Sequence, residues 1–449
     1  MRDKIVLGYD VMTYNGELPN CLNPKFYNTI YESSDFVFNK SRDVFNRTWG
    51  SEYPVFNSND YNRIAEKKLL SQIIDDRKKG DDYKWFYIIE PHSGLDLFFG
   101  NHPVHNQFVL NYMSQKAIHE IKVFNGNLLI NYIVDGGIGI TTENFKKIVG
   151  FTRFQNIPDE KVYFIFSDFR LKENLKKLNV NYKVFDFNFY LFFKAHEFNN
   201  VVTGKNNQST IRTTEDYLNS LEDDKKDFLV LTRHWKLHRI YILNKIYRLG
   251  LENSLVSWES SFFNEDMVNF VKNYDNNHVF FEELKTSKYV DVEDLVSVWG
   301  YGSEHAKIYN DTYLSIVTES MFFQEDVNFP TGFVSEKIWK PIGHCQPFIL
   351  AGPAGTLKYI RERYNFKTFH PFIDETYDSV EDDLQRINLI CDEIEKFSKK
   401  TKEEKIQFLK DVQEICFYNQ KLFLSLDGEF TNDLLDNPEL WKIYKFLKY

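Results

Sequence analysis

The stretch "FPTGFVSEKIWKPIGHCQPFILAGP", residues 329–353, decides the fold. A charged pair, Glu336 and Lys337, stands between a turn that contains Pro and Gly and the apolar run "PFIL" at 347–350. A short helix followed directly by a buried strand is typical of an α/β protein with a parallel sheet. Ser335 is predicted to cap that helix, which would place Glu336 and Lys337 in its first turn. Lys337 opposes the helix dipole there, so we expect an anionic ligand beside it.

The same alternation of strands and helices extends in both directions. Apolar runs typical of strands occur at 4–11, 85–94, 127–139 and 161–169, and again at 228–231, 314–317 and 347–350. The segments 62–80, 105–124 and 240–251 between them are predicted to be helical, with Gly250 ending the last helix. The charged, periodic tail from about Ser379 predicts long amphipathic helices. The pattern therefore predicts an α/β protein with mainly parallel sheets.

The length of 449 residues exceeds what one ordinary core supports, so at least two domains are expected. We predict an N-terminal Rossmann-like domain at 1–205, a polar linker at 206–226, a second Rossmann-like domain at 227–395 and C-terminal helices at 396–449. Ligands of open parallel sheets bind beyond the carboxyl ends of the strands. We therefore look for chemistry in the residues that follow each strand.

Composition restricts the partners and the compartment. The formal net charge of −10 disfavours nucleic acid or an anionic membrane as a partner, unless a local basic patch overcomes it. The four cysteines show no C-x-x-C spacing, so neither a zinc site nor a disulfide framework is indicated. The N-terminus lacks the pattern of a signal peptide, and no stretch approaches the roughly 20 apolar residues of a membrane span. We expect a cytoplasmic protein with no membrane span.

A basic cluster follows the predicted strand at 228–231. Arg233, Lys236 and Arg239 come after it, at the start of the next predicted helix. Cations and the N–H groups of a helix N-terminus together form an anion site, for which a diphosphate is the natural occupant. A solvated basic face at an element boundary is the alternative interpretation. The pair Glu336 and Lys337 could likewise hold a ribose and a phosphate, or Glu336 could only stabilise its helix.

Carboxylates also follow several strands. Glu319 is the carboxylate of the strand end "LSIVTES", Glu90 follows 85–89, and Asp135 follows 128–134. Either Glu90 or Asp135 could act as a general base, although polar residues at strand ends are common without a catalytic role. The "GGIG" at 136–139 is not a dinucleotide fingerprint, and no Walker loop occurs.

The combination "LSIVTES" followed by "GFVSEKIWKPIGHCQPFILAGP" resembles the donor-site signature of α-1,3-fucosyltransferases. With "LVLTRHWKLHRIYIL" upstream and "GTLKYIRERYNFKTFHPFIDETYD" downstream, it is also similar to glycosyltransferase-like proteins of large phages and viruses. The resemblance covers roughly residues 228–378. The sequence departs from the pattern in the insert "MFFQEDVNFPTG" and in Ser320, which directly follows Glu319.

The resemblance implies a GT-B fold, with two facing Rossmann-like domains, the first on the acceptor side and the second binding a nucleoside-diphosphate sugar. It implies that Glu336 binds the ribose, that Lys337 and Arg233 bind phosphate, and that Glu319 lies beside the donor sugar. Lys236 and Arg239, from the basic cluster, are expected to bind the donor diphosphate as well. A carboxylate of the first domain, Asp135 or Glu90, would deprotonate the acceptor hydroxyl of a glycan or another molecule. Such enzymes invert the anomeric carbon without a metal cofactor, and a viral chain would act in the host cytoplasm.

Two alternatives remain open. The same chemistry could act on hydroxylated bases in DNA, as in viral DNA-base glycosyltransferases, if a local basic cleft overcomes the acidic net charge. The chain could also be a degenerate glycosyltransferase fold that binds a glycan or a partner without catalysis.

Overall fold

The protein divides into two compact α/β units. The computed structural model describes residues 5–9, 65–89, 108–132, 142–204, 210–232, 235–274, 277–288, 305–324, 326–426 and 438–448. Unit 1 comprises Met1–Phe189, Glu325–Thr331 and Gly428–Tyr449, and unit 2 comprises Tyr190–Gln324 and Gly332–Asp427. The expected α/β class with parallel sheets is confirmed. No helix in the described ranges is both long and apolar enough to span a bilayer.

Unit 1 contains a six-stranded sheet in the order β2-β1-β3-β4-β5-β6, and every pair of neighbours is parallel. Its strands are β1 (Ile5–Tyr9), β2 (Ala65–Leu69), β3 (Trp85–Ile89), β4 (Gly126–Tyr132), β5 (Val162–Phe166) and β6 (Lys183–Asp186). The chain goes from β1 to β2 on one side and then to β3 on the other. This reversal is a topological switch point, and it lies between β1 and β3.

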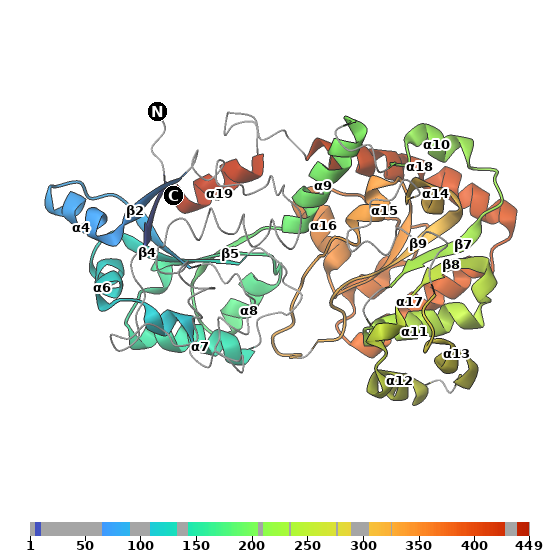
Figure 1. Ribbon diagram of the computed structural model, residues 1–449, viewed down its shortest axis with the longest axis horizontal. Coiled ribbons are helices and arrows are strands. Elements are labelled where there is room, and N and C mark those ends of the chain that lie inside the picture. The colour runs from blue at the N-terminus through green and yellow to red at the C-terminus, as the bar shows by residue number, and fades with distance from the viewer. Residues whose placement is uncertain are drawn as a thin grey trace. The chain divides into compact units, whose positions relative to one another are not determined.

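Helices cover the sheet of unit 1. They are α4 (Leu70–Lys78), α6 (Gln115–Val123), α7 (Thr142–Phe154), α8 (Leu171–Lys177) and α19 (Pro438–Lys448), with short 3-10 turns at Val109–Tyr112 and Asp159–Lys161. In Figure 1, α7 and α8 lie below the sheet and α19 lies above it. The core of this unit includes Phe329, from the insert that follows β9 in the sequence. Asn174 donates to the Pro330 carbonyl (2.7 Å) and holds that insert in place.

Unit 2 contains a four-stranded parallel sheet in the order β10-β9-β7-β8. Its strands are β7 (Lys226–Leu231), β8 (Ser254–Ser257), β9 (Thr312–Thr318) and β10 (Phe348–Ala351). The chain goes from β7 to β8 on one side and returns to β9 on the other. The switch point of unit 2 therefore lies between β7 and β9, and its carboxyl edge is where a ligand crevice is expected.

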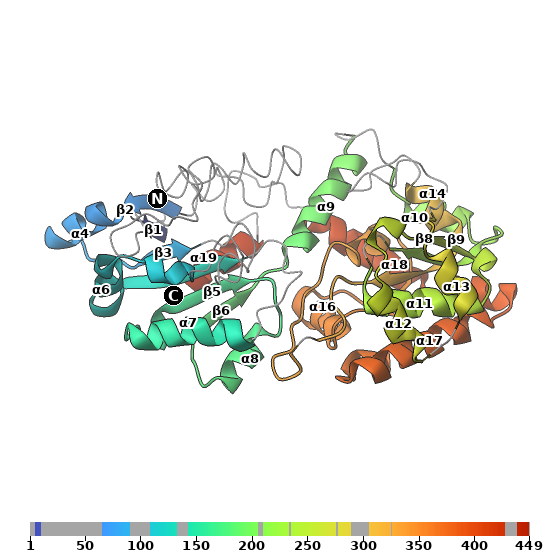
Figure 2. The same cartoon turned by 60° about the horizontal axis from the view of Figure 1, so that its bottom comes forward.

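Helices lie on both faces of this second sheet. They are α9 (Phe189–Val202), α10 (Thr214–Asn219), α11 (Leu237–Arg248), α12 (Glu265–Lys272), α13 (His278–Glu283), α14 (His305–Asn310), α15 (Trp339–Gly343), α16 (Thr356–Tyr364), α17 (Asp383–Ser398) and α18 (Lys402–Ser425), with 3-10 turns at Leu251–Asn253, Ser260–Phe262 and Glu375–Ser379. Figure 1 and Figure 2 show α11 and α17 on one face, and α14 and α18 on the other. The long amphipathic tail helices are confirmed as α17 and α18, and Gly250 follows α11 at φ +98° as predicted.

Two predicted helices start later than expected. Residues 65–69 of the segment 62–80 form β2, which pairs with β1, and the helix α4 begins only at Leu70. In the segment 105–124, the helix α6 begins at Gln115, because the Ser114 hydroxyl accepts a hydrogen bond from the Ala117 amide (3.0 Å) and caps it there. α10 lies in the segment for which a linker is predicted.

Candidate functional site

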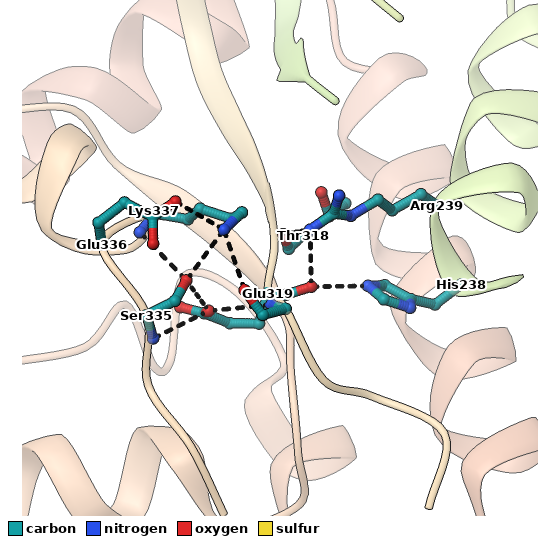
Figure 3. Close-up of polar contacts among 8 residues, drawn as sticks. His238, Arg239, Thr318, Glu319, Ser335, Glu336 and Lys337 are labelled. Atoms are coloured by element: carbon teal, nitrogen blue, oxygen red, sulfur yellow. Dashed lines mark hydrogen bonds and ion pairs between the residues drawn. The ribbon is translucent and has the colours of Figure 1, made fainter. Parts of the chain in front are cut away.

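The candidate site lies at the carboxyl end of β9, beside the switch point of unit 2. Glu319 follows the strand directly and is completely buried. Its Oε2 atom accepts hydrogen bonds from the backbone amides of Ser320 (3.2 Å) and Ser335 (3.1 Å), and from the Ser335 hydroxyl. Glu319 thus joins the end of β9 to the turn before α15 (Figure 3).

The turn at 335–337 carries the charged pair Glu336 and Lys337. The Lys337 ammonium lies 2.7 Å from Glu336 Oε1, and it also donates to the hydroxyls of Ser320 (3.1 Å) and Ser335 (3.2 Å). Both charged side chains are only partly exposed, Glu336 to 21% and Lys337 to 26%. Glu336 and Lys337 are therefore held in a fixed geometry while part of each stays accessible to a ligand.

The prediction that Ser335 caps a helix containing this pair is wrong. α15 begins at Trp339, its N-cap is Ile338, and Glu336 and Lys337 lie in the turn before it. Pro341 gives the physical reason, because in a helix that started at 336 its ring would clash with the carbonyl of Lys337. A start at Trp339 places Pro341 in the first turn, where its missing N–H leaves no hydrogen bond unmade. Lys337 therefore does not oppose a helix dipole, and an anion beside it would be favoured by the charge of a partly buried ammonium.

The start of α11 is attached to the same strand end. Within Figure 3, His238 Nε2 donates to the Glu319 carbonyl (3.0 Å), and Arg239 donates to the carbonyls of Thr318 (3.3 Å) and Glu319 (3.1 Å). The His238 ring stacks on Phe322, with 5.2 Å between ring centroids. Both α11 side chains are buried, so α11 and β9 form one rigid support for the turn.

The charges of the site differ in how burial affects them. Burial raises the pKa of Glu319, although Lys337 and Ser335 act against it. Burial would also raise the pKa of Glu336, but Lys337 and Lys340 outweigh it and lower that pKa to about 2. Burial lowers the pKa of Arg239 to about 10. At neutral pH Glu336 is therefore an ionised acceptor, while Lys337 and Arg239 contribute positive charge.

The N-terminus of α16 already binds a carboxylate of the protein itself. The Asp378 carboxylate accepts from the backbone amides of Leu357 (2.8 Å) and Lys358 (2.9 Å), in the first turn of α16. An acidic group at that position satisfies the N–H groups that would otherwise bind an anion. The first turn of α16 therefore offers fewer free N–H groups to an anion.

The structure brings together four of the predicted site residues: Arg239, Glu319, Glu336 and Lys337. Lys236 is exposed at the N-cap of α11. Glu90, Asp135 and Arg233 lie outside the described residues, and their roles stay predictions. Sequence reasoning missed the link from Glu319 to Ser335, for which the sequence offers no local signal because the insert separates the two residues.

No known family model matches this chain, and neither a curated protein nor a solved structure is significantly similar to it. The resemblance to α-1,3-fucosyltransferases therefore stays an expectation. The site consists of an ionised carboxylate and an ammonium, both partly buried, at the switch point of a parallel sheet. Such a pair can accept hydrogen bonds from hydroxyl groups and neutralise a phosphate.

The pH dependence of stability should report the burial of His238. Its pKa lies well below the ordinary value of 6.5, because burial and the neighbouring Arg239 disfavour the charged ring. The unfolded chain binds more protons below pH 6.5, so the folded state loses about 1.4 kcal/mol per pH unit as the pH falls. His238→Gln keeps a donor for the Glu319 carbonyl but does not titrate. Between pH 6.5 and 5.0, urea unfolding should show the wild type losing about 1.6 kcal/mol more than this variant. Parallel curves for the two proteins would contradict the buried, neutral His238.

Proposed function

We propose that this chain is an inverting glycosyltransferase, which moves a sugar from a nucleoside-diphosphate sugar to the hydroxyl group of a glycan or another acceptor. The observation that carries the proposal is the turn at 335–337, where a carboxylate and an ammonium 2.7 Å apart lie at the carboxyl edge of a parallel sheet. In this proposal Glu336 accepts hydrogen bonds from the ribose hydroxyls, and Lys337 binds a phosphate. The GT-B arrangement, with two Rossmann-like domains facing each other, is part of the same proposal.

The proposed reaction is a single displacement. The acceptor oxygen forms a bond to the anomeric carbon, the bond from that carbon to the diphosphate oxygen breaks, and a carboxylate takes the hydroxyl proton. The nucleoside diphosphate leaves with added negative charge, which Lys337 and Arg233 would stabilise. Preorganised cations of this kind usually contribute the largest share of catalysis.

The topology of unit 1 favours one of the two proposed bases. Glu90 follows β3 directly in the sequence, and β3 borders the switch point of that sheet. Asp135 follows β4, which does not border the switch point. Because ligands of open α/β sheets bind at the switch point, Glu90 is the stronger candidate for the general base.

A thermal-shift screen of the full chain tests this proposal. We expect at least one nucleoside diphosphate, or its sugar, to raise the melting temperature, since ligand at 100 times its Kd stabilises a folded protein by about 2.7 kcal/mol. The corresponding nucleosides, which lack phosphate, serve as matched controls and should have little effect. If no nucleoside diphosphate and no nucleotide sugar changed the melting temperature, the proposal would be wrong.

A further inference from the structure

Two lysines, Lys194 and Lys340, lie on α9 and α15, two helices that contact each other. Gly343 makes this contact possible: a Cβ atom at that position would lie 2.2 Å from the ring of Phe198. The same ring packs edge-on against His344, with 5.1 Å between centroids. The two helices therefore approach each other closely at Phe198 and Gly343.

This approach brings two lysines from distant parts of the chain together. Lys194 lies one turn before Phe198 on α9, and Lys340 lies three residues before Gly343 on α15. Residues three or four apart share one face of a helix, so both lysines lie on the contacting faces. Lys194 is 1% exposed, and its ammonium forms an ion pair with Glu197 (2.7 Å).

Lys340 differs from Lys337 and Lys194 in making no direct ion pair. Within the described part of the chain, no hydrogen bond or ion pair joins its ammonium, whereas Lys337 is paired with Glu336 and Lys194 with Glu197. Burial and the charge of Lys194 lower the pKa of Lys340 to about 8, although Glu336 and Glu197 act against this shift. A partly buried ammonium beside another cation is unfavourable unless an anion compensates it.

We propose that Lys340 binds the second phosphate of the nucleotide and makes the site select a nucleoside diphosphate over a nucleoside monophosphate. This inference rests on the proposed function. Lys337 meets the phosphate that both nucleotides carry, and Lys340, paired with no carboxylate, meets the phosphate that only the diphosphate carries. The positive charges of Lys194, Lys337 and Lys340 outnumber the negative charges of Glu336 and Glu197, and the phosphates supply the negative charge that is lacking.

Calorimetric titration of the full chain with UDP and UMP, and with GDP and GMP, tests the inference. Lys340→Met keeps the aliphatic side chain and removes the charge. It should weaken diphosphate binding by about 10- to 100-fold, the usual worth of one charge-assisted hydrogen bond, and change monophosphate binding less than about twofold. Lys340→Arg should keep the preference for the diphosphate. Lys399→Met, at a lysine that is 70% exposed, controls for the loss of one charge.

The outcomes separate the two proposals. If the wild type binds a diphosphate and Lys340→Met weakens both nucleotides equally or neither of them, the inference about Lys340 is wrong and the donor site stands. If the wild type binds no nucleotide at all, the proposed function fails, and the role of Lys340 fails with it. Failure of Lys340→Arg to keep the preference would show that the lysine acts through packing and not through charge.

Discussion

Lys337→Ala is expected to lower the affinity for a nucleoside diphosphate by about 100-fold while the chain stays folded. The ammonium is held by Glu336 (2.7 Å) and by the hydroxyls of Ser320 and Ser335, so a phosphate oxygen that replaces one of these hydroxyls binds a cation that is already in position. Because Lys337 meets the phosphate common to both nucleotides, the affinity for a monophosphate should fall by a similar factor. Calorimetry on the wild type and the variant measures both.

The design of this experiment has to separate binding from folding. Removal of Lys337 leaves Glu336 with one cation fewer, so the double variant Glu336→Gln, Lys337→Ala tests whether an unpaired carboxylate destabilises the turn. Circular dichroism and the melting temperature should stay close to those of the wild type in both variants. Lys337→Arg, which keeps the charge, should retain measurable binding. Full affinity in a folded Lys337→Ala protein would remove the phosphate-binding role.

Arg386→Met is expected to lower the free energy of unfolding by about 3–5 kcal/mol. The Arg386 side chain is 1% exposed and its guanidinium donates to four backbone carbonyls and to Asp383. The carbonyls belong to Phe322 (3.0 Å), Gly352 (3.3 Å), Val380 (2.7 Å) and Glu381 (3.2 Å). Arg386 thus joins α17 to the segments that follow β9 and β10, and its loss leaves several buried acceptors without a donor.

Urea unfolding of the purified variant measures this effect. Arg248→Met is the matched control, because Arg248 is exposed in the last turn of α11, and its replacement should change the stability by no more than about 0.5 kcal/mol. If Arg386→Met were as stable as this control, the buried guanidinium would not be what holds the strand ends in place.

The strands of the candidate site could be predicted from the sequence because they are short apolar runs that end in polar residues. "FLVL" and "LSIVT" lie in β7 and β9, and Glu319 follows β9 as expected, whereas Glu336 and Lys337 lie in a turn and not in the predicted helix. The order of the strands could not be predicted, because it depends on which crossover packs on which face. That order places the switch point between β7 and β9, and it turns scattered polar residues into one candidate site.

The misplaced helix starts have two different causes. Residues 65–69, "AEKKL", contain good helix formers, and pairing with β1 overrides that preference. The late start of α15 was readable from the sequence, since Pro341 restricts where a helix that contains it can begin. The closeness of Lys194 and Lys340 could not be predicted from the sequence, because it depends on the contact between Phe198 and Gly343.

The central claim is that the turn at 335–337 binds the diphosphate of a nucleotide sugar, and calorimetric titration with the nucleoside diphosphate that most stabilises the chain tests it most directly. We predict one nucleotide bound per chain in the wild type, with the affinity reduced about 100-fold in Lys337→Ala. Equal binding by the wild type and a folded Lys337→Ala protein, or no binding of any nucleoside diphosphate to the wild type, would contradict the claim.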